Sequence, residues 1–184
     1  MISLLRFIVR ILFRFSAINT GVLKTPGPVL LIPNHPSWLD WLFLGVCLDE
    51  DWRFVTSSRT AETVWFLRKV MVNRRTFPVV PTSPYAVREM ADFLEKGGRL
   101  VLFAEGRISV TGSLMKLFEG TGFLIRKTGA KVITCHLHGA KRVRFVRHSG
   151  WTRWFPRVTA VFGPVLSAPV FPGLSPSEDR ARLT

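Results

Sequence analysis

The sequence predicts one α/β domain preceded by an amphipathic helix, and three observations support this fold class. The chain has 184 residues, the size of one domain with a substantial buried core. Hydrophobic residues make up 47% of it, which excludes disorder as the main state. Short apolar runs bounded by Pro or Gly alternate with stretches of helical periodicity, a pattern typical of a central sheet flanked by helices.

The first fifteen residues predict a helix that lies in a membrane interface. Arg6, Arg10 and Arg14 are spaced by four, so on a helix they form one basic stripe in apolar surroundings. We expect the apolar surface among acyl chains and the arginines on lipid phosphates. No stretch is long enough to span a bilayer, and the arginines do not suit a signal peptide. The alternative is a helix packed on the protein's own core, but the apolar arc is wider than one such contact needs.

Strands are predicted at residues 29–32, 100–103, 131–137 and 157–162, and Val79 and Val80 are compatible with one more. Helices are predicted over residues 36–48, 60–72, 84–96 and 114–127. Ser175, followed by Pro176 and Glu178, predicts a further helix start, yet the chain stops at Thr184. We therefore expect an interface helix over residues 1–20, a main domain over residues 21–184, and a segment of a longer protein.

The charge balance points to an anionic partner. The chain has 26 Lys and Arg against 12 Asp and Glu, a formal net charge of +14, and a mean hydropathy of +0.24. A surface that is both basic and apolar suits a membrane. Residues 120–177 contain nine Lys and Arg and no acidic residue, with Trp151, Trp154 and Phe155 among them. This segment suits lipid headgroups or an acidic carrier protein. A nucleic-acid-binding module is the alternative, although no named binding motif appears and the apolar first helix has no use there.

The cysteines and two of the histidines carry weaker signals. Cys47 and Cys135 lie in apolar segments and form neither a disulfide framework nor a zinc pattern, which indicates a reducing compartment. His136 and His138 share one face of a predicted strand and could take part in a metal hydrolase site. The sequence shows no obvious third ligand, so we expect no metal.

The first candidate catalytic group is His35. It follows an apolar strand, at the end where open α/β sheets place their ligands. Asp40 lies about one helical turn later and can reach one imidazole nitrogen, leaving the other to take a proton from a hydroxyl. On spacing alone, a loop histidine near an aspartate is more often structural than catalytic.

A second predicted strand ends in Glu105, Gly106 and Arg107. Arg107 can bind a phosphate through two parallel hydrogen bonds, and Glu105 can orient it or hold a hydroxyl. A surface salt bridge beside a turn is an equally good interpretation of this segment taken alone.

Together these two segments resemble the glycerolipid acyltransferases. Residues 34–40, Asn-His-Pro-Ser-Trp-Leu-Asp, are similar to the family's His-x-x-x-x-Asp block, and residues 103–109 to its Phe-Pro-Glu-Gly block, with Ala104 in place of Pro. Residues 132–139 resemble the fourth block, with Thr134 in place of Pro. Residues 111–123 resemble the subgroup that includes the bifunctional 2-acylglycerophosphoethanolamine acyltransferase/acyl-ACP synthetase. The order of the blocks is far more specific than any one of them.

The resemblance implies an acyltransferase αβ sandwich, located on the cytoplasmic face of the inner or plasma membrane as a monotopic protein. It implies acyl transfer from acyl-ACP or acyl-CoA to a lysophospholipid, in this subgroup lysophosphatidylethanolamine; a 1-acylglycerol-3-phosphate acyltransferase is the alternative. His35 would be the general base and Asp40 its orienting partner, with no acyl-enzyme and no cofactor. The implied partners are membrane lipids, acyl carrier protein and an adenylate-forming acyl-ACP synthetase domain, and no nucleic acid. The phosphate would be held by Arg107, by Arg74 or Arg75, and by Lys116, in a pocket shaped by Glu105 and Gly106.

Overall fold

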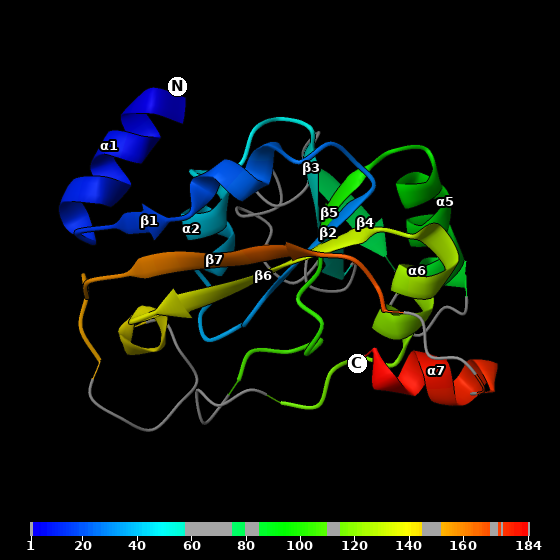
Figure 1. The fold of residues 1–184 in the computed structure, drawn as a ribbon. Helices are drawn as coiled ribbons and strands as arrows, with labels where there is room; N and C mark the ends of the chain where they lie inside the picture. The colour runs from blue at the N-terminus through cyan, green and yellow to red at the C-terminus, as the bar shows by residue number, and fades with distance from the viewer. Residues whose placement is uncertain are drawn as a thin grey trace.

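The structure is a computed structural model that describes residues 2–57, 75–79, 85–109, 115–144, 152–169, 173 and 175–183. A seven-stranded sheet in the order β1-β7-β6-β2-β5-β3-β4 forms its centre (Figure 1). The strands are β1 (Ser16–Ile18), β2 (Val29–Pro33), β3 (Trp52–Ser57), β4 (Thr76–Val79), β5 (Arg99–Val101), β6 (Lys131–His138) and β7 (Thr159–Leu166). The predicted α/β class is confirmed.

Five neighbouring strands of this sheet, from β6 to β4, run parallel to one another. β7 is antiparallel to β6, and β1 is parallel to β7. Leu31 in β2 pairs with Val101 in β5 and with Ile133 in β6, and β2 and β5 end within two residues of each other. The loops that follow them meet at one edge, where an open α/β sheet places its ligands.

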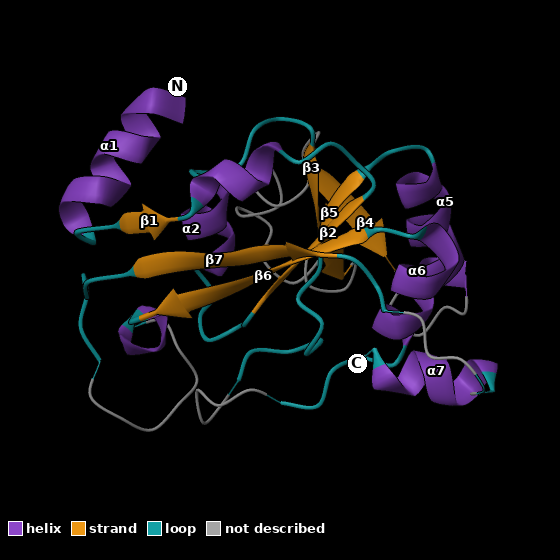
Figure 2. Cartoon of the chain, in the orientation of Figure 1, coloured by secondary structure: helices purple, strands orange, loops and turns teal. Residues whose placement is uncertain are grey.

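Helices cover both faces of the sheet (Figure 2). The helices are α1 (Ile2–Leu12), α2 (Asp40–Gly45), α5 (Tyr85–Glu95), α6 (Gly120–Thr128) and α7 (Pro176–Arg182), with short 3₁₀ turns η1 (Thr20–Lys24) and η2 (Ala140–Arg142). Successive residues of β2 alternate between the two faces, as the pleat requires. Leu31 packs in one cluster with Phe43 of α2, and Leu30 packs in the other with Met90 of α5 and Leu124 of α6. The sandwich architecture is therefore confirmed.

Two predicted helices begin later than their sequence pattern indicated. The helix predicted over residues 36–48 is α2, which starts at Asp40, because Ser37 and Asp40 bind nearby backbone N–H groups in a turn. The helix predicted over residues 114–127 is α6, which starts at Gly120. The N–H groups of Met115 and Phe118 donate instead to the loop after β5.

Other predicted elements have different outcomes. The helix predicted over residues 84–96 is confirmed as α5, and Ser175 caps α7 with a complete capping box. The strands β1 and β3 were not predicted, and the helix predicted over residues 60–72 lies outside the described residues.

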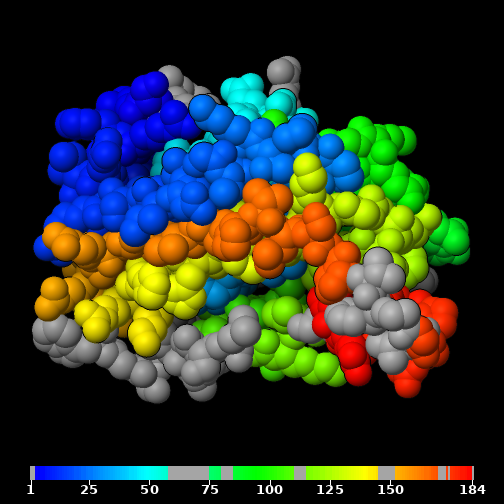
Figure 3. All heavy atoms as spheres, in the orientation of Figure 1, coloured from blue at the N-terminus to red at the C-terminus, as the bar shows by residue number. Residues whose placement is uncertain are grey.

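The helix α1 turns most of its apolar surface away from the protein. It buries Val9, whereas six large apolar side chains are 40–64% exposed: Leu4, Leu5, Phe7, Ile8, Ile11 and Leu12. Arg6 is predicted to contact lipid phosphates as part of the basic stripe. In the structure its Nε donates instead to the Val46 carbonyl at the end of α2 (2.7 Å). In Figure 3 this N-terminal segment lies along β7, with which β1 pairs. Within the described chain, no helix has the length and apolar character to cross a bilayer.

Candidate active site

His35 and Asp40 come together as their spacing predicts. His35 follows β2, and its Nδ1 lies 2.9 Å from Oδ2 of Asp40, the first residue of α2. The Ser37 N–H donates to the same carboxylate oxygen (2.8 Å). Asp40 is fully buried, whereas the His35 side chain is 20% exposed. A carboxylate on Nδ1 fixes the tautomer that leaves Nε2 as a proton acceptor.

Burial governs the protonation of Asp40. It raises the pKa of this carboxyl from 3.8 to about 6, against the hydrogen bonds from His35 and Ser37, which lower it. Oδ1 is buried and finds no hydrogen-bond partner among the described residues. Among the described residues, the carboxylate is therefore solvated by His35 and the Ser37 N–H alone, and this low local polarity strengthens its attraction for an imidazolium.

The loop after β5 fixes the backbone of His35. Glu105 is buried, and its Oε1 accepts from the His35 N–H (3.0 Å) while its Oε2 accepts from the Met115 N–H (3.1 Å). The Ser109 N–H donates to the His35 carbonyl (2.8 Å). The His35 ring stacks on Phe103, with centroids 4.1 Å apart. Glu105 thus holds the His35 backbone in place through a hydrogen bond, and its predicted contribution to substrate binding stays a prediction.

Gly106 makes the turn that separates Glu105 from Arg107. Its φ of +66° lies in the left-handed region that favours glycine, and its N–H donates to the Phe103 carbonyl (2.9 Å). Arg107 is exposed, and in the described part of the chain no ion pair or hydrogen bond engages its guanidinium. Its charge is therefore accessible to an anion at the edge of the sheet.

The structure describes two of the other three predicted phosphate ligands, and both have partners within the protein. Arg75 differs from its prediction as a phosphate ligand. Its guanidinium donates to the carbonyls of Gly45 and Leu48 (3.2 and 3.3 Å), and burial lowers its pKa. It precedes β4, at the edge of the sheet opposite to His35. The exposed Lys116 is paired with Glu119 (3.0 Å). Arg74 lies outside the described residues.

The cysteines are poor nucleophiles. Burial raises the pKa of the Cys47 thiol to about 11 and raises the pKa of Cys135 as well. A thiol that resists ionisation is a weak nucleophile, so neither residue suits an acyl-enzyme mechanism.

His136 and His138 lie side by side on β6, with ring centroids 4.1 Å apart. The described residues offer them no further His, Cys, Asp or Glu with which to form a metal-binding group.

Three residues that support His35 were not identified from the sequence: Ser37, Phe103 and Ser109. Only Ser37 had a readable signal, because a serine three residues before an aspartate often forms a turn with it. The other two depend on how the loop after β5 folds against β2.

The structure is thus an α/β sandwich with a histidine paired to a buried carboxylate at the carboxyl ends of its parallel strands. The acyltransferase family model matches residues 15–138, which are 124 of the 184 residues, and the chain therefore belongs to the acyltransferase family. Its fold is similar to the crystal structure of the 1-acyl-sn-glycerophosphate (LPA) acyltransferase PlsC from Thermotoga maritima. The TM-score is 0.70 at 17% identity, and the match covers 99% of this chain and 75% of that one.

Proposed function

We propose that this acyltransferase moves a fatty acyl group from an acyl thioester, acyl-ACP or acyl-CoA, to the free hydroxyl of a lysophospholipid. The observation that carries the proposal is the contact between His35 Nδ1 and the buried Asp40, which leaves Nε2 to act as a base. Membership of the acyltransferase family supports the reaction type. The likeness to a lysophosphatidic acid acyltransferase supports the glycerolipid substrate class.

In the proposed mechanism, the acceptor hydroxyl gives its proton to His35 Nε2 while its oxygen attacks the thioester carbonyl. Asp40 stabilises the imidazolium that forms. The tetrahedral intermediate then collapses, the C–S bond breaks, and the leaving thiolate takes the proton from His35. One ester forms, one thioester breaks, and no acyl-enzyme is needed.

We assign the accessible Arg107 to the acceptor phosphate, because it lies on the same loop that positions His35. Arg74 and Lys116 are further candidates for this role, whereas the Arg75 guanidinium is directed to backbone carbonyls.

Two acceptors are candidates. Lysophosphatidylethanolamine is favoured by the resemblance of residues 111–123 to the bifunctional subgroup, in which an adenylate-forming synthetase domain supplies acyl-ACP. Lysophosphatidic acid is favoured by the substrate named for the structural neighbour. Both acceptors present a hydroxyl to the same base, and we expect no cofactor besides the acyl thioester.

The test is acyl transfer from labelled acyl-ACP and acyl-CoA to each of these lysolipids in mixed vesicles. We expect product with one acceptor in preference to the other, and loss of product in His35→Gln with the circular dichroism spectrum retained. Equal turnover by His35→Gln would show that another group is the base. No product with either acceptor, using the native protein, would contradict the proposed substrate class.

We further propose that α1 holds the protein in one leaflet, on the cytoplasmic face of the membrane. The outward side chains support this, since Leu4, Phe7 and Ile11 are 62–64% exposed and form one face of the helix. Fully burying a large apolar side chain is worth about 1.5–3 kcal/mol, so three polar substitutions should weaken vesicle binding by about 100-fold or more.

The variant to test is the triple change of Leu4, Phe7 and Ile11 to Gln, measured by cosedimentation with anionic vesicles. A matched control changes Tyr85 and Phe118, which are 64% and 50% exposed, to Gln. Unchanged binding of the α1 variant would place the membrane contact elsewhere.

A further inference from the structure

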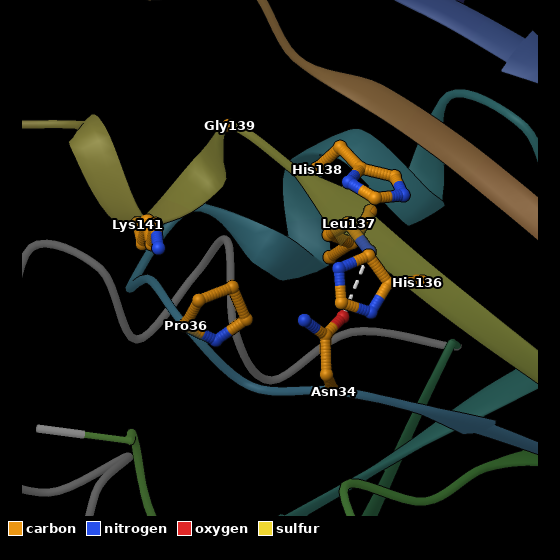
Figure 4. A pocket seen from close by; sticks show the side chains of 7 residues that line it. All are labelled: Asn34, Pro36, His136, Leu137, His138, Gly139 and Lys141. Carbon is orange, nitrogen blue, oxygen red and sulfur yellow. Dashed lines mark hydrogen bonds between the residues drawn. The ribbon is translucent and has the colours of Figure 1, made fainter. Parts of the chain in front are cut away.

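A polar pocket of about 110 Å³ lies beside the loop that carries His35. Figure 4 shows that two segments far apart in the sequence form its walls. One wall is Asn34 and Pro36, the two neighbours of His35. The other wall is the end of β6 and the turn after it, comprising His136, Leu137, His138, Gly139 and Lys141.

Hydrogen bonds hold the two walls together. The Leu137 N–H donates to Asn34 Oδ1 (2.8 Å), and the Asn34 N–H donates to the Cys135 carbonyl (3.1 Å). The position of the pocket relative to His35 is therefore fixed by the pairing of β2 with β6.

The pocket is lined by one lysine and two histidines, groups that are positive when protonated. His136, His138 and Lys141 are exposed and line it together, and none of the described residues that line it is acidic. The pKa of His136 is lowered, mainly because its ring is partly removed from water. The nearby His138 and Lys141 lower it further. These groups repel one another when charged, and a bound anion would replace that repulsion with attraction.

The position of the pocket favours the phosphate of the acyl donor over the phosphate of the acceptor. The acceptor phosphate is only a few bonds from the hydroxyl that attacks, so its ligands must lie near the His35 imidazole. The donor phosphate is separated from the thioester by the whole pantetheine arm. Both neighbours of His35 line this pocket, whereas His35 itself does not, so an anion bound in the pocket is not in contact with the imidazole that acts as the base.

We propose that the His136–His138–Lys141 pocket binds the phosphate of the pantetheine arm that acyl-CoA and acyl-ACP have in common. This inference rests on the proposed acyl transfer from a pantetheine thioester. It places the two substrate phosphates on opposite sides of β2, with the donor at β6 and the acceptor beside Arg107 after β5. The thioester and the acceptor hydroxyl then meet at His35 between them.

The kinetic test compares two donors that differ only in the phosphate, the dodecanoyl thioesters of 4′-phosphopantetheine and of pantetheine. For the native protein we expect a KM about tenfold lower with the phosphorylated donor, the effect of one hydrogen bond to a charged group. In the double variant His138→Gln, Lys141→Gln this preference should disappear, with kcat within about twofold and the acceptor KM unchanged.

The matched control is Lys131→Gln, at the opposite end of β6, which should keep the preference. A preference retained in the double variant, or a change in the acceptor KM instead, overturns the proposal.

A binding measurement separates this site from the proposed reaction. Titration calorimetry with 4′-phosphopantetheine should give a Kd about tenfold lower than with pantetheine, and the double variant should bind the two equally. This result without any acyl transfer would support the pocket and contradict the proposed function. Acyl transfer that proceeds with the same KM for the two donors would support the proposed function and contradict the assignment of the pocket. Displacement of 4′-phosphopantetheine by 1-acylglycerol 3-phosphate, but not by equal inorganic phosphate, would assign the pocket to the acceptor and overturn the proposal.

Discussion

The two sides of His35 differ in how their polar groups are used. On the β5 side, both Glu105 oxygens and the Ser109 N–H are bound to backbone atoms, so this loop fixes the position of the imidazole. On the β6 side, His136, His138 and Lys141 line a pocket, and all three are positive when protonated. Groups that are fully hydrogen-bonded within the protein position a catalytic residue, whereas like charges placed together favour an external anion. Substitutions on the first side should thus lower kcat, and those on the second should raise a KM.

The largest effect is expected for Asp40→Asn. The amide cannot stabilise the imidazolium as a carboxylate does, so kcat should fall by about 10²–10⁴-fold with little change in either KM. Steady-state kinetics with both substrates provides the measurement, and Asp92→Asn on the exposed face of α5 is the control. A fall in kcat of less than about threefold would remove Asp40 from the mechanism.

The same substitution should reveal a stability cost of the site. The folded-state pKa of Asp40 lies above its value of 3.8, so the native state binds this proton more tightly than the unfolded state. The contribution of Asp40 to the free energy of unfolding therefore falls as the pH rises from about 4 to about 6. The free energy of unfolding of Asp40→Asn relative to the native protein should rise by about 2 kcal/mol between pH 4 and pH 8. Urea unfolding at both pH values would measure it, and a difference that is constant with pH contradicts the raised pKa.

Glu105→Gln tests positioning on the β5 side. The amide keeps one acceptor oxygen, so either the His35 N–H or the Met115 N–H loses its partner, and a displaced imidazole should lower kcat by about 10–100-fold. Both KM values should stay within about twofold, since Glu105 is not assigned to a substrate. Glu119→Gln, in the exposed pair with Lys116, is the matched control. An increase in the acceptor KM with kcat unchanged would return Glu105 to its predicted role in substrate binding.

Acid pH should affect the same side of the site. Asp40 must be ionised to stabilise the imidazolium, and its pKa is raised to about 6, so kcat should fall by about tenfold between pH 7 and pH 5. Initial rates at saturating substrates would show this acid limb. Activity that is independent of pH over this range would mean that Asp40 stays ionised or is not required.

The smallest effect is expected for Cys47→Ser. The thiol donates to the Phe43 carbonyl within the core and resists ionisation, so kcat should change by less than about twofold. Loss of most activity with folding retained would indicate an acyl-cysteine intermediate, which labelled donor would trap.

The sequence predicted the parts of the molecule that depend on local patterns. The class of fold, α5, the capped start of α7, and the pair formed by His35 and Asp40 follow from periodicity, capping residues and spacing. The start of α2 was misplaced, because Pro36 suits a first helical turn but the side chains of Ser37 and Asp40 form a turn there instead.

What the sequence could not predict depends on contacts between distant segments. Glu105 binds the His35 backbone 70 positions away, and Arg75 donates to the carbonyls at the end of α2. Both residues are charged and were therefore assigned to substrate, since a sequence does not show which buried carbonyls or N–H groups lack a partner. The pocket at β6 has the same origin, because only the pairing of β2 with β6 brings His136 beside Asn34.

The hydrogen bond from Arg6 to Val46 has a geometric consequence for the reaction. It attaches α1 to one end of α2, and Asp40 begins the other end of the same six-residue helix, about 9 Å away at the rise of an α-helix. With α1 in the lipid interface, as proposed above, His35 and Asp40 would be held within one short helix length of that anchor. A lysolipid would then need to raise only its headgroup and hydroxyl to reach His35 while its acyl chain stays in the leaflet. The search for the acceptor becomes a two-dimensional diffusion problem, and its rate should depend on the surface density of lysolipid rather than on its bulk concentration.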